Sequence, residues 1–141
     1  MNIANLLTTK GRPVVTIRFA QSVTEVALLA EQSLGALVVV DGESKPIGIV
    51  TERHIVRRLA TDDQILTRAV GEIMTPNLVT VMPQDDLASV LHVMTERRIR
   101  HVPVIDSKHL VGIVSLGDIV WFQRDQYRGD VDTLETRVMS A

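Results

Sequence analysis

The chain carries one sequence pattern twice. A Gly-Ile-Val triplet at residues 48–50 recurs at 112–114, an offset of 64 positions, and the similarity extends far upstream of both triplets. In each copy, an apolar run ending in aspartate precedes the triplet, at 37–41 and at 102–106. Two similar units usually bury their apolar faces against each other, so the duplication predicts paired clefts between two related halves.

Each copy is predicted to fold as strand, helix, strand, strand, helix. Short apolar runs at 14–17 and 78–81 predict the first strands. An amphipathic helix then follows in each copy, with apolar residues at i, i+3, i+4 and i+7: Val23, Val26, Ala27 and Ala30, then Leu87, Val90, Leu91 and Met94.

The second and third strands of each copy are expected to form a hairpin. The runs at 37–40 and 102–105 are continuously apolar, which is typical of strands buried on both faces. Turn-forming residues separate each run from its Gly-Ile-Val strand. The closing helices are expected to begin near Thr51 and Ser115.

Composition narrows the class of protein. The 141 residues suit one compact domain, and no apolar run is long enough for a membrane span. The net charge of −2, with both signs interspersed, does not favour nucleic-acid binding. Cysteine is absent and the N-terminus lacks the pattern of a signal peptide, so a cytoplasmic location is expected.

The last helix is expected to be long. Val131, Leu134 and Val138 continue an apolar stripe beyond Gly129. This stripe predicts either a helix that faces a partner or a helix that folds back onto the domain, and the sequence does not separate the two.

A hydroxyl and a carboxylate stand three positions apart after the second Gly-Ile-Val strand, at Ser115 and Asp118. This is the pattern of a helix start, with Ser115 as N-cap and Asp118 in the first turn. The same placement fits ligand binding, because a carboxylate offers two acceptor oxygens to the two hydroxyls of a ribose. Backbone N–H groups at the helix start can also face a phosphate. Both interpretations stay open at this point.

The densest positive cluster occupies residues 97–101. Its first two arginines suit a helix C-terminus, where cations complement the helix dipole. Arg100 and His101 directly precede a buried strand, where residues that line a cleft are expected in an α/β unit. At the corresponding positions, the first copy has the small residues Gly35 and Ala36. Basic residues from one copy beside small residues from the other fit an anionic ligand.

Catalytic and metal-binding patterns are missing from the sequence. The four histidines show no ligand spacing, and no Ser-His-Asp set, carboxylate pair or P-loop is present. We therefore predict neither catalytic residues nor a metal site, and do not expect an enzyme.

The two copies together resemble the paired cystathionine-β-synthase-type domain, known as the CBS pair or Bateman module. Stand-alone bacterial CBS-pair proteins of this length are closely similar. The resemblance covers roughly residues 7 to 127 and rests on Met74-Thr75-Pro76, on 101–106, 110–115 and 117–118, and on 35–41 and 48–53.

The resemblance implies an α/β (α+β) fold of tandem β-α-β-β-α repeats related by a pseudo-two-fold axis. The first repeat with its N-terminal segment would span 1–68, the second 69–128, and a helical tail 129–141. Together they would form one module. Modules of this family often pair, so a homodimer is expected.

The resemblance also implies a regulatory ligand that contains adenosine, such as AMP, ADP, ATP, NAD(H) or S-adenosylmethionine, with no catalytic cofactor. Asp118 would hold the ribose, and Arg100 and His101 would contact phosphate. The residues expected at this nucleotide-binding cleft are Lys10, Val15, Gly35, Ala36, Leu37, Arg100, His101, Ser115, Gly117 and Asp118.

The second cleft departs from the family pattern. Its expected residues are Thr51, Arg53, His54 and Val79, and histidine stands where the family has aspartate. A neutral imidazole offers one donor and one acceptor, so it cannot chelate both ribose hydroxyls. This cleft is expected to be empty, weaker, or used for another part of a larger ligand.

The resulting hypothesis is a regulatory module that senses energy or redox state through an adenine nucleotide and acts on a downstream protein partner. The alternative is a dimerisation or partner-docking module whose clefts hold no ligand, which the histidine at position 54 favours.

Overall fold

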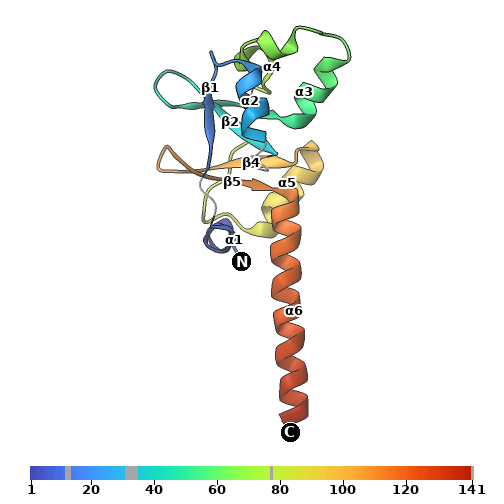
Figure 1. Cartoon of the computed structure of the whole chain (residues 1–141). Coiled ribbons are helices and arrows are strands. Elements are labelled where there is room, and N and C mark those ends of the chain that lie inside the picture. The colour runs from blue at the N-terminus through green and yellow to red at the C-terminus, as the bar shows by residue number, and fades with distance from the viewer. Residues whose placement is uncertain (12–13, 31–34, 77, 141) are drawn as a thin grey trace.

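The computed structural model describes the backbone of residues 1–11, 14–30, 35–76 and 78–140, and the side chains of the same ranges except 28–30 and 129–140. Its elements are α1 (Ile3–Lys10), β1 (Thr16–Arg18), α2 (Val23–Ala30), β2 (Ala36–Val40), β3 (Pro46–Thr51), α3 (Glu52–Leu59), a 3-10 turn η1 (Ile65–Thr67), α4 (Val70–Ile73), α5 (Leu87–Arg97), β4 (His101–Asp106), β5 (His109–Ser115) and α6 (Leu116–Ser140). Figure 1 shows the strands in the middle of the molecule and the helices on the outside.

The first repeat forms a three-stranded sheet in the order β1-β2-β3. β1 runs parallel to β2, because α2 carries the chain back across the sheet, and β2 and β3 form the predicted antiparallel hairpin. All five residues of β2 are buried, which confirms a strand covered on both faces. The β-α-β-β-α order expected from the sequence is therefore present.

The second repeat repeats the hairpin but not the full first strand. β4 and β5 pair antiparallel, and the predicted strand at 78–81 is reduced to a single parallel bridge between Val81 and Val104. The ladder stops there because Met82 N–H donates to the Asp85 carboxylate at 2.8 Å and Pro83, which follows, has no N–H. The prediction of a four-residue strand was wrong in length, although Val81 occupies the expected place.

Buried apolar side chains form two cores, one in each repeat. The N-terminal core consists of Ile17, Val23, Val26, Leu37, Val39, Val50, Ile55, Ile65, Val70 and Ile73. The C-terminal core consists of Ile3, Leu6, Val81, Leu87, Val90, Met94, Val102, Val104, Val114, Ile119 and Phe122. The buried residues of α4 belong to the N-terminal core, and the buried residues of α1 belong to the C-terminal core. The division of the sequence into two repeats between residues 68 and 69 remains a prediction.

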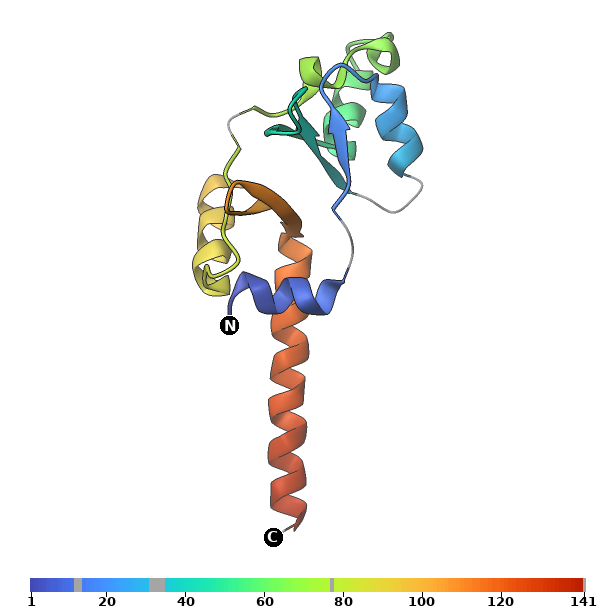
Figure 2. The same ribbon diagram turned by 90° about the vertical axis from the view of Figure 1, so that its left-hand side faces the viewer.

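Helix α1 was not predicted, although its signals are local. Asn2 caps its start by accepting a hydrogen bond from Asn5 N–H at 3.0 Å, and Gly11 ends it in the left-handed region at φ 62°. Ile3 and Leu6 are buried in the C-terminal core, and Ile3 N–H donates to Asp85 O at 3.0 Å. The first helix in the sequence therefore belongs, in space, to the second repeat (Figure 2).

The glycines of the two Gly-Ile-Val triplets allow another segment to approach the strand closely. A Cβ atom on Gly48 would overlap the Met74 sulfur and lie 3.0 Å from Thr75 O. A Cβ atom on Gly112 would lie 2.8 Å from Leu7 Cδ2, in α1. In both repeats, the recurring glycine thus allows a neighbouring segment to pack closely on the third strand.

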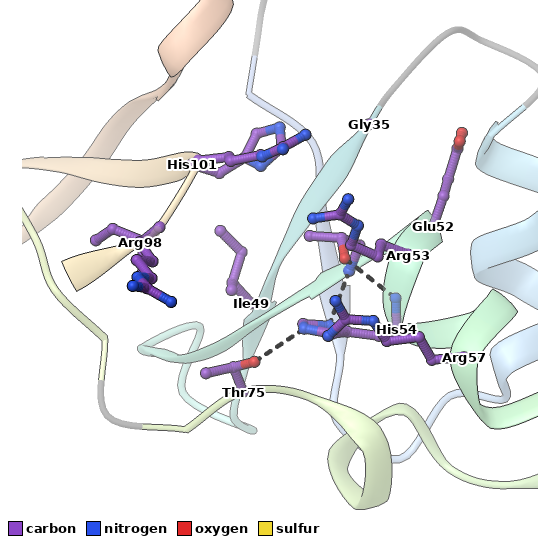
Figure 3. A pocket seen from close by; sticks show the side chains of 12 residues that line it. Gly35, Ile49, Glu52, Arg53, His54, Arg57, Thr75, Arg98 and His101 are labelled. Atoms are coloured by element: carbon purple, nitrogen blue, oxygen red, sulfur yellow. Dashed lines mark hydrogen bonds between the residues drawn. The ribbon is translucent and has the colours of Figure 1, made fainter. Parts of the chain in front are cut away.

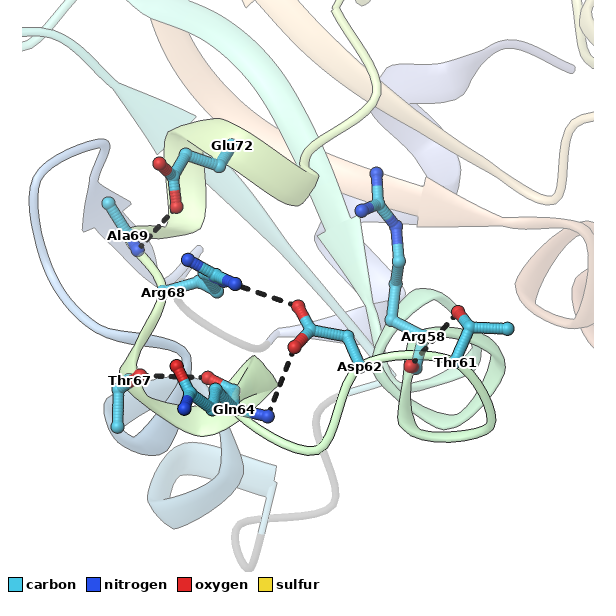
Figure 4. Close-up of polar contacts among 8 residues, drawn as sticks. All are labelled: Arg58, Thr61, Asp62, Gln64, Thr67, Arg68, Ala69 and Glu72. Carbon is cyan, nitrogen blue, oxygen red and sulfur yellow. Dashed lines mark hydrogen bonds and ion pairs between the residues drawn. The ribbon is translucent and has the colours of Figure 1, made fainter.

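The segment between α3 and α4 is held by a compact set of polar contacts (Figure 4). The Asp62 carboxylate accepts hydrogen bonds from Gln64 N–H at 3.0 Å and from Arg68 Nε at 3.2 Å. These two hydrogen bonds, in that order, hold the pKa of Asp62 below its ordinary value. The Glu72 carboxylate accepts from Ala69 N–H at 3.3 Å and caps α4.

Helix α6 has 25 residues and runs straight away from the rest of the molecule (Figure 1). Its length confirms the prediction of an extended last helix, and its direction decides against a helix that folds back onto the domain. The stripe of Val131, Leu134 and Val138 lies outside the residues whose side chains the structure describes. In the described part of the chain, no helix is long and apolar enough to cross a membrane.

Candidate functional site

Ser115 and Asp118 form a reciprocal cap at the junction of β5 and α6. Asp118 N–H donates to Ser115 Oγ at 3.0 Å, and Ser115 N–H donates to Asp118 Oδ2 at 2.9 Å. The helix-start interpretation is therefore correct for these two residues. It leaves the ligand-binding interpretation open as well, because Oδ1 of the same carboxylate makes no hydrogen bond to any described residue.

Lys10 contacts the same carboxylate oxygen of Asp118 as Ser115 N–H does. Its ammonium group lies 2.6 Å from Asp118 Oδ2 and donates to Ile113 O at 2.7 Å. Burial by itself raises the pKa of Asp118, but the hydrogen bonds from Lys10 and Ser115 outweigh it and hold that pKa below the ordinary value. The carboxylate at this cleft is therefore ionised at neutral pH and already carries one cationic partner. Lys10 and Asp118 also line a cavity of about 250 Å³ beside Trp121.

His101 begins β4 and faces the first repeat. A Cβ atom on Gly35 would lie 3.5 Å from His101 Nε2, within ordinary van der Waals contact, so the imidazole lies directly beside the backbone of the first repeat. Burial is the main cause that lowers the pKa of His101; Asp118 opposes it, while Lys10 and Arg100 add to it. The imidazole is therefore neutral at pH 7, with a carboxylate and two cations near enough to influence it.

His54 takes a capping role in the first repeat. Thr51 N–H donates to His54 Nδ1 at 3.3 Å, so the proton sits on Nε2, which donates to Thr75 Oγ1 at 3.1 Å. Burial, followed by the charges of Arg57 and Arg58, lowers the pKa of His54. The ring is therefore neutral. Both of its nitrogen atoms make hydrogen bonds, drawn as dashed lines in Figure 3.

A pocket of about 440 Å³ lies between the two repeats, and it combines residues that the sequence had assigned to separate clefts. Thr51, Arg53 and His54 of the expected second cleft line it together with Gly35, Arg100 and His101 of the expected first cleft. Asp118 and Lys10 line the other cavity instead. The structure thus places the expected phosphate-binding residues Arg100 and His101 in one cavity and the expected ribose-binding carboxylate of Asp118 in another.

The remaining expected residues lie close by with different surroundings. Leu37 is buried in the N-terminal core, and Val15 packs against that core. Both side chains therefore belong to the core of the first repeat. Gly117 is exposed on the first turn of α6 and Val79 is half-buried before the Val81 bridge. Ala36 pairs with Thr51 across the hairpin.

Two arginines of the pocket, Arg57 and Arg98, were not predicted as site residues from the sequence. Arg57 lies one turn after Arg53 on α3, a spacing that places both side chains on one face and could have been noticed. Arg98 had been explained as a helix-end cation. It does end α5, in the left-handed region at φ 54°, but its side chain also lines the pocket.

No group of three or more histidine, aspartate or glutamate side chains within the described residues could hold a metal ion. The polar groups that converge on the pocket are mainly guanidinium and imidazole groups. Donor groups of this kind bind phosphoryl or carboxylate oxygens.

The comparison with known proteins agrees with the repeats. Residues 5–61 and 70–125 each match the family model described as CBS domain. The CBS domain-containing protein YhcV of Bacillus subtilis is 35% identical over 108 residues, which cover 75% of this chain and 76% of YhcV. Several other curated relatives are longer, and the chain spans about a third to just over half of their length.

Two solved structures are similar over most of the chain. The CBS-domain containing protein ATU1752 of Agrobacterium tumefaciens has a TM-score of 0.79 and 37% identity, covering 84% of this chain and 90% of its own. The CBS domain pair of protein MJ0100, solved with 5'-methylthioadenosine and S-adenosyl-L-methionine, has a TM-score of 0.78 and 28% identity, covering 89% and 98%. With both repeats matched, this chain belongs to the CBS domain family and contains a pair of CBS domains.

Proposed function

We propose that this CBS pair is a regulatory module that binds an adenosine-containing nucleotide, AMP, ADP, ATP or NAD(H), at the cleft marked by Asp118. The observation that carries the proposal is an ionised carboxylate, held by a helix cap, whose Oδ1 accepts no hydrogen bond from a described residue. The solved complex of the CBS pair of MJ0100 with two adenosine derivatives supports the class of ligand.

In the proposed complex, a ribose hydroxyl donates to Asp118 Oδ1, and the second hydroxyl competes with Lys10 for Oδ2. Gly35, which lines the pocket between the repeats without a side chain, leaves space for the base beside Ala36, and the phosphate extends toward Arg100 and His101 of the same pocket. Such a ligand contacts both repeats, so binding favours one relative orientation of the repeats over others. A protein partner that binds one of these orientations would read the signal.

Calorimetric titration of adenosine tests the assignment of the carboxylate. Asp118→Asn keeps the shape of the side chain but replaces an acceptor oxygen with a donor, so adenosine affinity should fall about ten- to a hundredfold. His54→Asn is the matched comparison in the other repeat and should change adenosine affinity much less, because no carboxylate is lost there. A larger loss in His54→Asn than in Asp118→Asn would contradict the proposed site.

One observation favours the alternative of a docking or dimerisation module. Val56 on α3 and Val120 on α6 are equivalent in the two repeats and are 65% and 53% exposed, with Trp121 55% exposed beside the latter. Exposed apolar side chains at equivalent helix positions favour an interface with another chain. If none of AMP, ADP, ATP, NAD, NADH and S-adenosylmethionine raises the melting temperature, the docking function is the better explanation.

A further inference from the structure

The two repeats hold the segment that precedes the opposite repeat by different means. His54 and Asp118 occupy equivalent positions, each three residues after a capping hydroxyl residue. His54 contacts Thr75, in the segment that leads into the second repeat, and Thr75 also exchanges two backbone hydrogen bonds with Ile49, at 2.9 and 3.1 Å. Asp118 contacts Lys10, in the segment that leads into the first repeat. The contact in the first repeat is therefore reinforced through the backbone, whereas the contact in the second depends on a lysine side chain.

Helix α1 is anchored differently at its two ends. Near its beginning, its backbone forms two hydrogen bonds with the backbone of residues 83–85, at 2.8 and 3.0 Å. Among the described residues, no backbone hydrogen bond joins the end of α1 to β5 or α6. The described polar contacts at that end are those of Lys10 Nζ, to Ile113 O and to Asp118 Oδ2. Loss of these contacts would free the end of α1 and leave its beginning in place.

The ammonium group of Lys10 occupies an oxygen that a ribose would need. Lys10 Nζ lies 2.6 Å from Asp118 Oδ2, which also accepts from Ser115 N–H at 2.9 Å. A carboxylate that binds two neighbouring hydroxyls offers one oxygen to each, so the second hydroxyl and the ammonium group compete for Oδ2. The cavity of about 250 Å³ beside this carboxylate is also lined by Leu6 and Thr9, so a sugar placed there contacts α1 directly.

We propose that Lys10 is an autoinhibitory latch: a nucleoside that binds Asp118 displaces the ammonium group and frees the end of α1 from the second repeat. This inference rests on the proposed nucleotide site and adds the element that responds to the ligand. Because α1 precedes the first repeat in sequence and packs on the second (Figure 2), freeing its end loosens a connection between the repeats. The free energy of breaking the latch is subtracted from that of binding, so the latch also lowers the affinity for the ligand.

Calorimetric titration of the full chain with adenosine tests the competition. Lys10→Met removes the ammonium group and keeps an unbranched stem, so adenosine affinity should rise about five- to thirtyfold, as expected when a half-buried ion pair no longer has to be broken. Lys10→Arg keeps a cation at this position and should leave the affinity close to that of wild type. Lys45→Met is the matched control, because Lys45 lies in an exposed turn and forms no ion pair with a described residue. Its affinity should equal that of wild type.

Hydrogen exchange of the backbone amides tests the release of α1. In wild type, adenosine should speed exchange at residues 7–11 and slow it at 115–118. A bound ligand that only adds contacts slows exchange, so faster exchange at the end of α1 is specific to displacement. In Lys10→Met, exchange at residues 7–11 should be fast without adenosine and should rise no further when adenosine binds.

Two results would overturn the latch: a Lys10→Met variant that binds adenosine no more tightly than wild type, and exchange at residues 7–11 of wild type that adenosine leaves unchanged or slows. Either result leaves the proposed nucleotide site standing if Asp118→Asn loses adenosine affinity. Absence of adenosine binding to both wild type and Lys10→Met would overturn the proposed site, and the latch with it.

Discussion

Replacing Lys10 with methionine tests the polar contact that spans the most sequence among the described residues. The substitution keeps an unbranched apolar stem of similar length and removes the ammonium group that lies 2.6 Å from Asp118 Oδ2 and 2.7 Å from Ile113 O. Because α1 precedes the first repeat but packs on the second, this contact also fixes the end of α1 on β5 and α6.

The expected loss of stability follows from how exposed the pair is. The side chains of Lys10 and Asp118 are 23% and 27% exposed, so the pair is neither a surface ion pair nor a fully buried one. Hydrogen bonds to charged groups contribute about 1.5–3 kcal/mol when shielded, and exposed pairs contribute about 0–1 kcal/mol. Lys10→Met should therefore lower the free energy of unfolding by about 1–2 kcal/mol at pH 7, which corresponds to a fall in Tm of about 3–6 °C.

The pH dependence has a definite sign. The pKa of Asp118 is lowered in the folded protein, so its contribution is fully present above the unfolded value of about 3.9 and is lost as the pH falls through the folded value. In Lys10→Met the main cause of the lowering is gone and burial of the carboxyl, which raises its pKa, remains. The stability difference between wild type and variant should therefore be largest at neutral pH and shrink on acidification.

Urea denaturation followed by circular dichroism, at pH 7 and at several values below pH 4, measures this difference. Lys45→Met is the control, because it removes a lysine from an exposed turn that makes no ion pair with a described residue. A Lys10→Met variant as stable as wild type at pH 7, with an unchanged pH profile, would show that the pair contributes nothing to the fold.

Three further predictions concern packing, ligand and assembly. Gly48→Ala should destabilise more than Gly112→Ala, by about 2–4 against about 1–2 kcal/mol in thermal denaturation, because backbone as well as side-chain atoms block the first and a flexible leucine the second. Arg100→Ala should leave adenosine binding unchanged and weaken ATP more than AMP in titrations. Wild-type AMP affinity should fall as the pH rises past the bound-state pKa of His101, because a neutral imidazole must gain a proton to contact phosphate; a flat profile would remove His101 from the phosphate site. The chain should be a homodimer by light scattering at micromolar concentration, and deletion of 129–141 should weaken it; a monomer that ignores the deletion would contradict this.

Most of the fold was readable because its signals are local. The spacing of apolar residues predicted α2 and α5, the β-branched runs predicted β2 and β4, and the turn residues predicted both hairpins. The cap formed by Ser115 and Asp118 was also readable, because its hydrogen bonds join residues three positions apart. Local interactions of this kind depend on the identity and spacing of a few neighbouring residues.

The site itself depended on tertiary structure. Lys10 reaches Asp118 across 108 positions of sequence, and only the packing of α1 on the C-terminal core brings them together. Sequence alone identified Arg53 and Arg100 as binding residues in separate clefts and explained Arg98 as a helix cap, whereas the arrangement of the repeats places all of them around one pocket. Residue identity determines which charges a chain carries, but the way two independently built cores sit beside each other determines which of those charges meet.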